Sequence, residues 1–408
     1  MNSKQFSIVL FIGVIIGGLG LYLYKNQDAS YKSSDQTLGK KLLGEFLVND
    51  VAQVTIQHGT NEVNLVKQDD VWKVKERFNY PANFGEISEF VRKASELKVV
   101  QSVKVGASQF SRLELVKGDK GSNAPTQVEF KDKSGKAIKS MLLGKKHVKQ
   151  SQQQDSSPFG GGGGDWPDGR YVLVGDGAQG VAVVSDPLSN VEPKPDQWLN
   201  KDFIKVEKIK SVAIASPVAT NSWKVSRETE TGDWQLADKK EGEDFDKGKV
   251  SGLNYALSSP SFNDVVAPDA KPEDLGFDQP TVATIETFDK SVYTVKVGKH
   301  GGDENYFINV AVAADIAKER TPGKEEKPED KAKLDKEFNE KTAKQKEKFD
   351  KEKAYEKWTF QISKWTVDAL LKDRKDLMAE KKAEAKPGDP AAKKDDPTAD
   401  DKDEDEKK

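Results

Sequence analysis

The chain of 408 residues has no cysteine and only three histidines. The lack of cysteine excludes disulfide bonds, thiol nucleophiles, iron–sulfur clusters and cysteine-ligated zinc. The histidines are His58, His147 and His300, and none of them belongs to an HxxxH, HxH or HExxH metal-binding pattern. The sequence therefore predicts no metal ion and no cofactor, it singles out no catalytic residue, and we do not expect an enzyme.

Neither sign of charge dominates, because 65 basic residues stand against 68 acidic ones and the net charge is −3. This balance gives no general electrostatic reason to bind nucleic acid or an anionic membrane surface. Charged residues make up 33% of the chain and hydrophobic residues only 35%. We therefore expect part of the chain to lie outside any packed core.

Only one long hydrophobic run is present, over residues 6–24, which carry no charge. As a helix this run would span about 28 Å, close to the hydrocarbon core of a bilayer. It predicts an uncleaved, single-pass membrane anchor, with the bulk of the chain on the extracytoplasmic side. A cleaved signal peptide is the alternative. Gly13 and Gly17 have the GxxxG spacing of a helix pair, so a homodimer through them is one interpretation and ordinary glycine use is the other.

The remainder of the chain contains an internal repeat at a spacing of about 155 to 160 residues. The repeat is clearest at two lone tryptophans, Trp72 and Trp234, each inside a strand-like pattern. We expect both tryptophans to anchor a hydrophobic core. The predicted organisation is an anchor and polar linker at 1–41, a first repeat at 42–200, a second repeat at 201–378 and a disordered, charged tail at 379–408.

Each copy has several short strands of period two and one amphipathic segment. In the first copy, Ile87, Phe90, Val91 and Ala94 have helical spacing behind a capping box formed by Asn83 and Glu86. The second copy has Val250, Leu253 and Leu257 at the corresponding place. We therefore predict an α+β fold in which an N-terminal transmembrane helix precedes two tandem, mainly antiparallel sheets with one principal helix each.

The copies differ in their insertions. A Gly, Gln and Ser-rich loop at 149–169 interrupts the first copy, and a charged insertion at about 314–357 interrupts the second. The apolar positions of the second insertion are sparse, with Leu334, Phe338 and Phe349 at 328–357. This composition favours a solvated helix, and a partner-binding arm is the alternative.

One motif imitates a nucleotide site. The segment 175–180 matches GxGxxG after a strand-like run, but a dinucleotide fingerprint needs a helix next, and Val181-Ala-Val-Val is strand-like. We interpret these glycines as a hairpin turn. Asp165 and Asp168 flank Trp166 and would be the carboxylates of an enzyme, but nothing in the sequence distinguishes this pair from others.

The sum of these landmarks resembles a family of bacterial membrane-anchored proteins with a repeated domain of unknown function, encoded beside gliding-motility-type ABC transporter components. The resemblance covers residues 42–378. It rests on the anchor, the strand at 51–56, Trp72, Tyr80-Pro-Ala, Leu113, the segment 275–280, Gly144, Gly298, Tyr171 and Tyr306. It implies an accessory role beside ABC transporter subunits or other envelope proteins, and it implies no catalytic or ligand-binding residue.

The expected function is therefore a non-catalytic, periplasmic or otherwise extracytoplasmic accessory or scaffold protein. We expect it to be anchored in the bacterial inner membrane and auxiliary to an ABC-type transporter or an envelope assembly. The alternative is a module that binds an envelope polymer or a small ligand in the cleft between the repeats, with Trp166 as an exposed aromatic contact. A third, less favoured interpretation is an enzyme that uses Asp165 and Asp168.

Overall fold

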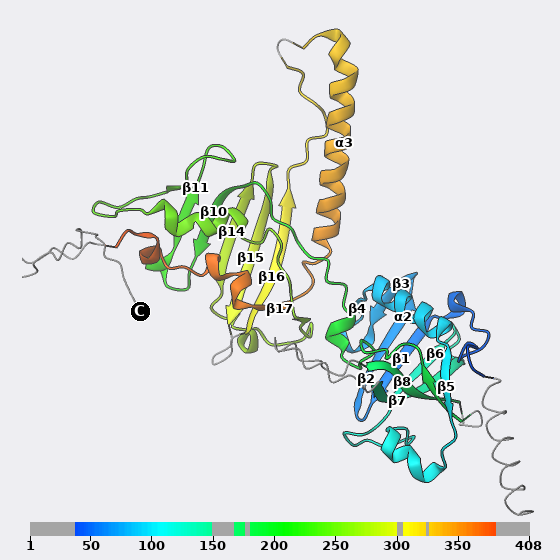
Figure 1. Ribbon diagram of the computed structural model, residues 1–408. Coiled ribbons are helices and arrows are strands. Elements are labelled where there is room, and N and C mark those ends of the chain that lie inside the picture. Colours follow the sequence, from blue (N-terminus) through cyan, green and yellow to red (C-terminus); the bar gives the residue numbers. More distant parts are fainter. Residues whose placement is uncertain (1–36, 149–166, 176–179, 300–304, 324–325, 381–408) are drawn as a thin grey trace, which may run out of the picture.

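The computed structural model describes residues 37–148, 167–175, 180–299, 305–323 and 326–380. Two large antiparallel sheets, each built from a separate stretch of the chain, make up most of this part (Figure 1). The prediction of an α+β fold with one principal helix in each copy is therefore wrong, because the described part of the chain is mostly β-sheet and contains few helices.

The first sheet has nine strands in the order β4-β3-β2-β1-β6-β7-β8-β9-β5. In chain order they are β1 (Gln53–His58), β2 (Asn61–Gln68), β3 (Val71–Val74), β4 (Tyr80–Pro81), β5 (Val99–Val103), β6 (Thr126–Lys131), β7 (Ala137–Val148), β8 (Pro167–Val174) and β9 (Val181–Val184). Burial alternates along β1 and β6, as period-two patterning requires.

The second sheet has eight strands in the order β12-β11-β10-β14-β15-β16-β17-β13. They are β10 (Ile209–Ala215), β11 (Trp223–Ser226), β12 (Gln235–Leu236), β13 (Asp264–Val265), β14 (Thr281–Thr287), β15 (Ser291–Lys299), β16 (Asn305–Ala314) and β17 (Phe360–Ser363). In each sheet, one edge strand comes earlier in the chain than the strand with which it pairs. These edge strands are β5, which pairs with β9, and β13, which pairs with β17.

Two α-helices lie in the described residues, α2 (Phe84–Glu96) and α3 (Pro328–Lys353). The Asn83 side chain caps α2 by accepting hydrogen bonds from the backbone N–H groups of Gly85 and Glu86. The backbone N–H of Asn83 donates a hydrogen bond to the carbonyl of Trp198. In the predicted capping box, the Glu86 side chain would have accepted this bond.

The remaining short helices are of the 3₁₀ type. They are η1 (Val48–Asp50), η2 (Lys75–Arg77), η3 (Ala107–Leu113), η4 (Pro195–Trp198), η5 (Ala219–Asn221), η6 (Lys247–Tyr255), η7 (Pro272–Leu275), η8 (Lys364–Thr366), η9 (Asp368–Leu370) and η10 (Arg374–Leu377). The helix predicted around Val250 and Leu253 is η6. It contains Gly248, Ser251 and Gly252, and each glycine costs about 1 kcal/mol relative to alanine in an α-helix, which explains the weaker helix.

The predicted membrane anchor at 6–24, with Gly13 and Gly17, lies outside the described residues. Among the residues that are described, no helix has both the length and the apolar character needed to cross a bilayer. Helix α2 is only 13 residues long, and α3 contains nine lysines and eight acidic residues. This finding contradicts the predictions of a single-pass membrane protein and of its location in the inner membrane.

The core is continuous across both sheets. Trp72 and Trp234 are both buried, which confirms their predicted role as core residues. Helix α2 covers one face of the first sheet, where the ring of Phe90 lies 5.6 Å from that of Phe130 and 6.0 Å from that of Trp198. A smaller cluster, centred on Leu115 and Leu142, closes the opposite face.

The sheets meet through aromatic side chains near the edge strand β4. The Tyr80 ring lies 5.0 Å from Trp358, 5.8 Å from Phe262 and 6.1 Å from Phe360, measured between ring centroids. Tyr80 is almost fully buried there. Beside this cluster, Nε of Arg77 lies 2.6 Å from Oδ1 of Asp264. The place where a cleft between the repeats was expected is therefore packed with aromatic rings.

Candidate functional site

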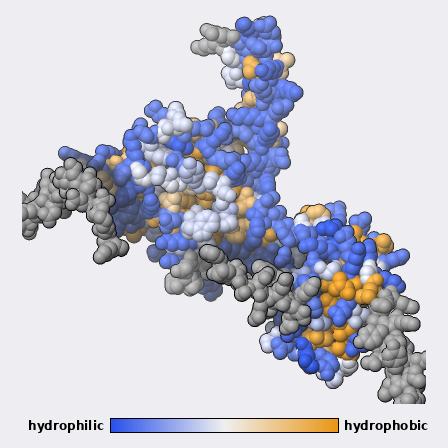
Figure 2. Space-filling model, viewed as in Figure 1, coloured by the Kyte–Doolittle hydropathy of each residue, from blue (hydrophilic) through white to orange (hydrophobic). Residues whose placement is uncertain are grey.

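Helix α3 forms an arm that projects well beyond the second sheet (Figure 1). Its 26 residues span about 39 Å. The prediction of a charged helix in the second insertion is confirmed over these residues. On the face shown in Figure 2 the arm is almost entirely hydrophilic, whereas apolar surface gathers around the first sheet.

The C-terminal end of α3, which we call the root of the arm, lies along residues 202–207. This connecting segment is part of the stretch of chain that joins the two sheets. Oδ2 of Asp202 is 3.0 Å from Nζ of Lys351, and Oε2 of Glu207 is 3.6 Å from Nζ of Lys348. Just after the helix, the ring of Tyr355 lies 5.6 Å from that of Phe203. Residues three or four apart on a helix share a face, so one face of α3 holds the connecting segment at several points.

A buried carboxylate fixes the root further. Glu352 is the only residue of α3 that is buried, and its Oε2 accepts a hydrogen bond of 2.7 Å from the Tyr293 hydroxyl of β15. Its Oε1 accepts a second bond, of 2.9 Å, from the backbone N–H of Lys205. Burial raises the pKa of Tyr293, and the hydrogen bond to Glu352 raises it further, so the phenol stays protonated and remains a donor.

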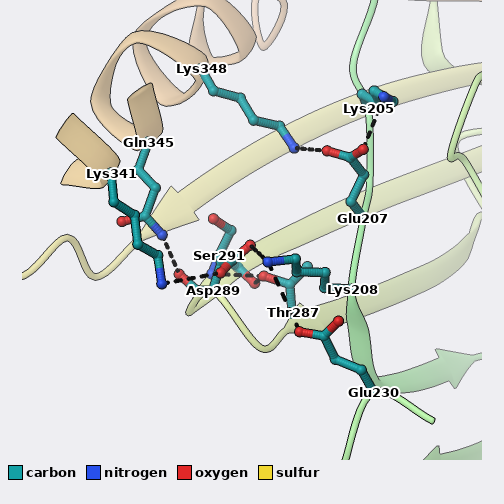
Figure 3. Close-up of polar contacts among 10 residues, drawn as sticks. All are labelled: Lys205, Glu207, Lys208, Glu230, Thr287, Asp289, Ser291, Lys341, Gln345 and Lys348. Carbon is teal, nitrogen blue, oxygen red and sulfur yellow. Dashed lines mark hydrogen bonds and ion pairs between the residues drawn. The ribbon is translucent and has the colours of Figure 1, made fainter. Parts of the chain in front are cut away.

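A second set of polar contacts, around Asp289 in the β14–β15 hairpin, meets the middle of the arm (Figure 3). The Asp289 carboxylate lies 4.0 Å from Nζ of Lys341 and 3.7 Å from Nζ of Lys208, and its carbonyl accepts a bond of 3.4 Å from Gln345. These long distances at partly exposed side chains indicate weak contacts. Contact with the sheet therefore fades towards the middle of the helix.

At the N-terminal end of α3, the tip of the arm, the preceding residue Arg320 forms ion pairs with two carboxylates. Its guanidinium binds both carboxylate oxygens of Glu326 at 2.5 Å, and its Nε lies 2.6 Å from Oδ1 of Asp335. The hydrogen bond from Arg320 lowers the pKa of Glu326. A two-pronged ion pair of this kind fixes geometry as well as charge, so Arg320 holds Glu326 and Asp335 in a defined relation to each other.

The two faces of α3 differ in character. Leu334, Phe338 and Phe349 are half-buried on the inner face, whereas the lysines and acidic residues of the outer face are mostly exposed. Exposed ion pairs at i and i+4, such as Lys333 with Glu337 and Lys336 with Glu340, support the helix. The outer face therefore offers charges of both signs and no apolar patch to a partner.

Of the two carboxylates considered for catalysis, the structure describes only Asp168. Asp165 and Trp166 lie outside the described residues, whereas Asp168 is in β8. Oδ1 of Asp168 is 2.6 Å from Nδ1 of His147, and the imidazole meets the ring of Tyr171 at a centroid distance of 5.7 Å. The structure thus brings a histidine to Asp168 that the sequence did not link to it, because the two residues are 21 positions apart on neighbouring strands.

The other histidines and the glycine motif are only partly described by the structure. His58 is in β1, His300 lies outside the described residues, and no group of three or more potential metal ligands occurs in the described part of the chain. Residues 176–179 of the GxGxxG motif are also outside it. Strand β9 begins directly after Gly180 and runs antiparallel to β8, which confirms the interpretation as a hairpin.

Sequence reasoning did not find the contacts between the arm and the connecting segment. Nothing in the sequence distinguishes Asp202, Lys205 and Glu207 from other charged residues, and their partners are more than 140 positions away. Charged residues are so common in this chain that no sequence signal selects these pairs.

Comparison of the chain with curated proteins and with solved structures gives no match. A family model described as a domain of unknown function, DUF4340, matches residues 72–280, from within β3 to the residue before β14. The match includes parts of both sheets and the connecting segment, and it covers half of the chain. The protein therefore belongs to the DUF4340 family, whose domain is of unknown function.

Proposed function

We propose that the protein is a non-catalytic accessory or scaffold protein that holds two β-sheets in a fixed relation and presents the α3 arm to a partner protein. The observation that carries this proposal is the contrast along α3. Its root is tied to the connecting segment by Lys348, Lys351 and the buried Glu352, whereas its far half extends away from the sheet.

The surface chemistry of the arm supports a protein as the partner. Alternating lysine and acidic side chains complement a surface that also carries both signs, and they give specificity more than affinity. Because the chain resembles proteins encoded beside ABC transporter components, a subunit of such a transporter is the first candidate to test.

The correspondence of the two sheets supports a further part of this proposal, that the chain contains two repeated units. The order β2-β1-β6-β7-β8-β9-β5 in one sheet has the counterpart β11-β10-β14-β15-β16-β17-β13 in the other. Gly144 in β7 and Gly298 in β15 occupy equivalent positions, each against a leucine carbonyl, that of Leu113 or Leu275. On this proposal the arm is an addition to the second unit.

Site-specific photocrosslinking in cells tests the scaffold role. A photoreactive amino acid at Ala332 or Ala343, on α3, should capture the same partner, whereas one at Lys133, in the exposed β6–β7 turn, should not. The double change Lys333→Glu and Lys336→Glu should abolish capture. The matched change Lys117→Glu and Lys120→Glu, at exposed sites of the first unit, should leave it intact.

Two results would count against the proposal. One is equal capture from the arm and from Lys133, which would indicate random collision. The other is full rescue of a deletion phenotype by a chain with the arm charges reversed, since the arm would then have no role in the cell.

The alternative of a ligand in a cleft between the repeats has no supporting observation, because Tyr80, Phe262 and Trp358 fill that region. The pair of His147 and Asp168 is the feature that favours an enzyme. A pair of this kind can orient an imidazole, but catalysis also needs a reacting group held beside it, and we do not propose one.

A further inference from the structure

A cleft of about 560 Å³ opens on the first sheet. This volume is within the range of small-molecule sites. The cleft's Lys139 pairs with Phe130, against which Phe90 of α2 packs, so the cleft and α2 lie on the same face. One wall is the segment that precedes β1, including Leu42 and Leu43, and the opposite wall is formed by residues of β5, β7, β8 and β9. The cleft lies within the first unit, well away from α3.

The wall that precedes β1 is firmly held. The backbone N–H of Gly39 donates to the carbonyl of Val99 at 2.8 Å, that of Leu42 donates to Leu97 at 2.7 Å, and that of Val99 donates back to Lys40 at 3.0 Å. Gly39 and Gly44 have φ values of +72° and +61°, a conformation that favours glycine. The segment therefore turns sharply at both ends and lies against the start of β5 between them.

The floor of the cleft is apolar. Leu43, Val99 and Ala182 are all less than 9% exposed and belong to the main core. Ser102 pairs with Ala182 in the sheet, so both side chains lie on the same face. The cleft thus reaches the hydrophobic interior of the first sheet.

Three lysines surround this apolar floor, Lys40, Lys41 and Lys139, and no carboxylate lines the cleft in the described part of the chain. None of the three has an ion-pair partner among the described residues. Lys139 is the most informative of them. It pairs with the fully buried Phe130, so this half-buried lysine lies on the core-facing side of β7.

A lysine on the apolar side of a sheet is unfavourable unless its charge is compensated. Ion pairs are abundant elsewhere in the protein. Three cations that have no ion-pair partner in the described part of the chain, beside an apolar floor, therefore point to a ligand that has both an anionic group and an apolar part. We propose that the cleft binds a single-chain anionic amphiphile, with its acyl chain along Leu43, Val99 and Ala182 and its carboxylate at Lys139, Lys40 and Lys41. The net charge of the chain, −3, gives no indication of this site, because the three lysines are gathered locally and are balanced by acidic residues elsewhere in the chain.

Binding to the full-length protein tests the proposal with dodecanoate as the probe, used below its micellar concentration. We expect saturable binding that is at least about fivefold tighter than that of dodecyltrimethylammonium, which has the same chain and the opposite charge. Acetate, which has the head group alone, should not compete. Equal binding of the two amphiphiles would overturn the proposal, because an apolar surface alone would then explain the binding.

Variants locate the site. Lys139→Met keeps most of the side-chain volume and should weaken dodecanoate binding at least about fivefold, whereas Lys133→Met, in the exposed turn of the same hairpin, should have no effect. Ser102→Phe keeps all three lysines and should weaken binding by filling the cleft. Unchanged affinity in both Lys139→Met and Ser102→Phe, with unchanged thermal unfolding, would contradict the proposal.

Photolabelling with a diazirine analogue of dodecanoate gives a readout that does not depend on affinity. Mass spectrometry should place the label on peptides that contain residues 40–44 or 174–182. Label found elsewhere would overturn the proposal, and so would chemical crosslinks that place residues 6–24 of this chain in the cleft, since the occupant would then be the chain itself.

Discussion

The hydroxyl of Tyr293 donates a hydrogen bond of 2.7 Å to the carboxylate of Glu352, which joins the second sheet to the last turns of the arm in a buried environment. Because the other carboxylate oxygen accepts from the backbone of Lys205, one side chain holds the sheet, the arm and the connecting segment together. This three-way contact fixes the direction in which α3 projects from the second sheet.

Tyr293→Phe should therefore destabilise the protein by about 1.5–3 kcal/mol, because it removes a hydrogen bond to a buried carboxylate without creating a large cavity. Urea unfolding gives the change in free energy. Hydrogen exchange should also become faster in the second half of α3. Tyr255→Phe, at an exposed tyrosine, is the control and should change little, and equal effects in the two variants would contradict the role of Glu352.

Tyr80 lies at the centre of the aromatic cluster that joins the two sheets. Tyr80→Ala should cost about 3–5 kcal/mol, because it leaves a cavity among Phe262, Trp358 and Phe360. Calorimetry should show a single unfolding transition in the parent and two in the variant, as the sheets lose their contact. Tyr80→Phe keeps the ring and should retain the single transition. If Tyr80→Ala also unfolds in one step, the sheets are coupled by other contacts.

Acid should weaken the ion pair between Glu243 and Arg374, in which Nε of Arg374 lies 2.8 Å from Oε1 of Glu243. Hydrogen bonds from Arg374, followed by one from the backbone of Lys240, lower the pKa of Glu243 to about 2. A carboxylate whose pKa is lower in the folded state stabilises fully above its unfolded pKa of about 4.5, and this contribution is lost as the pH falls towards 2.

The measurement is the urea midpoint of Glu243→Gln and of the parent across this range. We expect the variant to be less stable at pH 7 and the difference to shrink steadily below about pH 4.5. Glu241→Gln, at an exposed neighbour, should follow the parent at every pH. A difference that is constant down to about pH 2 would contradict the role of the Glu243 charge.

Two glycines are required by close packing between strands and loops. A Cβ atom at Gly298 would overlap the carbonyl oxygen of Leu275, and one at Gly144 would overlap that of Leu113. Either change to alanine should destabilise by about 1–3 kcal/mol or more through overpacking. Gly252→Ala is the control, since its Cβ would lie 3.7 Å from that of Ala369, an ordinary contact. Thermal unfolding of the three variants distinguishes these positions.

Local pattern was enough to predict some features of the protein. The period-two runs lie in strands such as β1 and β6, Trp72 and Trp234 are buried, Asn83 caps α2, and the charged insertion contains helix α3. These features depend on the residues that lie next to one another in the chain, so spacing and composition report them. The same reasoning overestimated the segment around Val250, where glycines and packing favour a 3₁₀ helix.

The tertiary structure alone decided the rest. The order of the strands, the contacts of Glu352 with Tyr293 and Lys205, and the lysines gathered around one apolar cleft join residues that are far apart in the chain. Lys139 shows the reason most clearly, since in the sequence it is one of many lysines. Its significance comes from the face of β7 on which it lies, and that face is set by the pairing of Lys139 with Phe130 in the sheet. Such pairing is a property of the whole folded chain, because each contact is stable only when the others have formed.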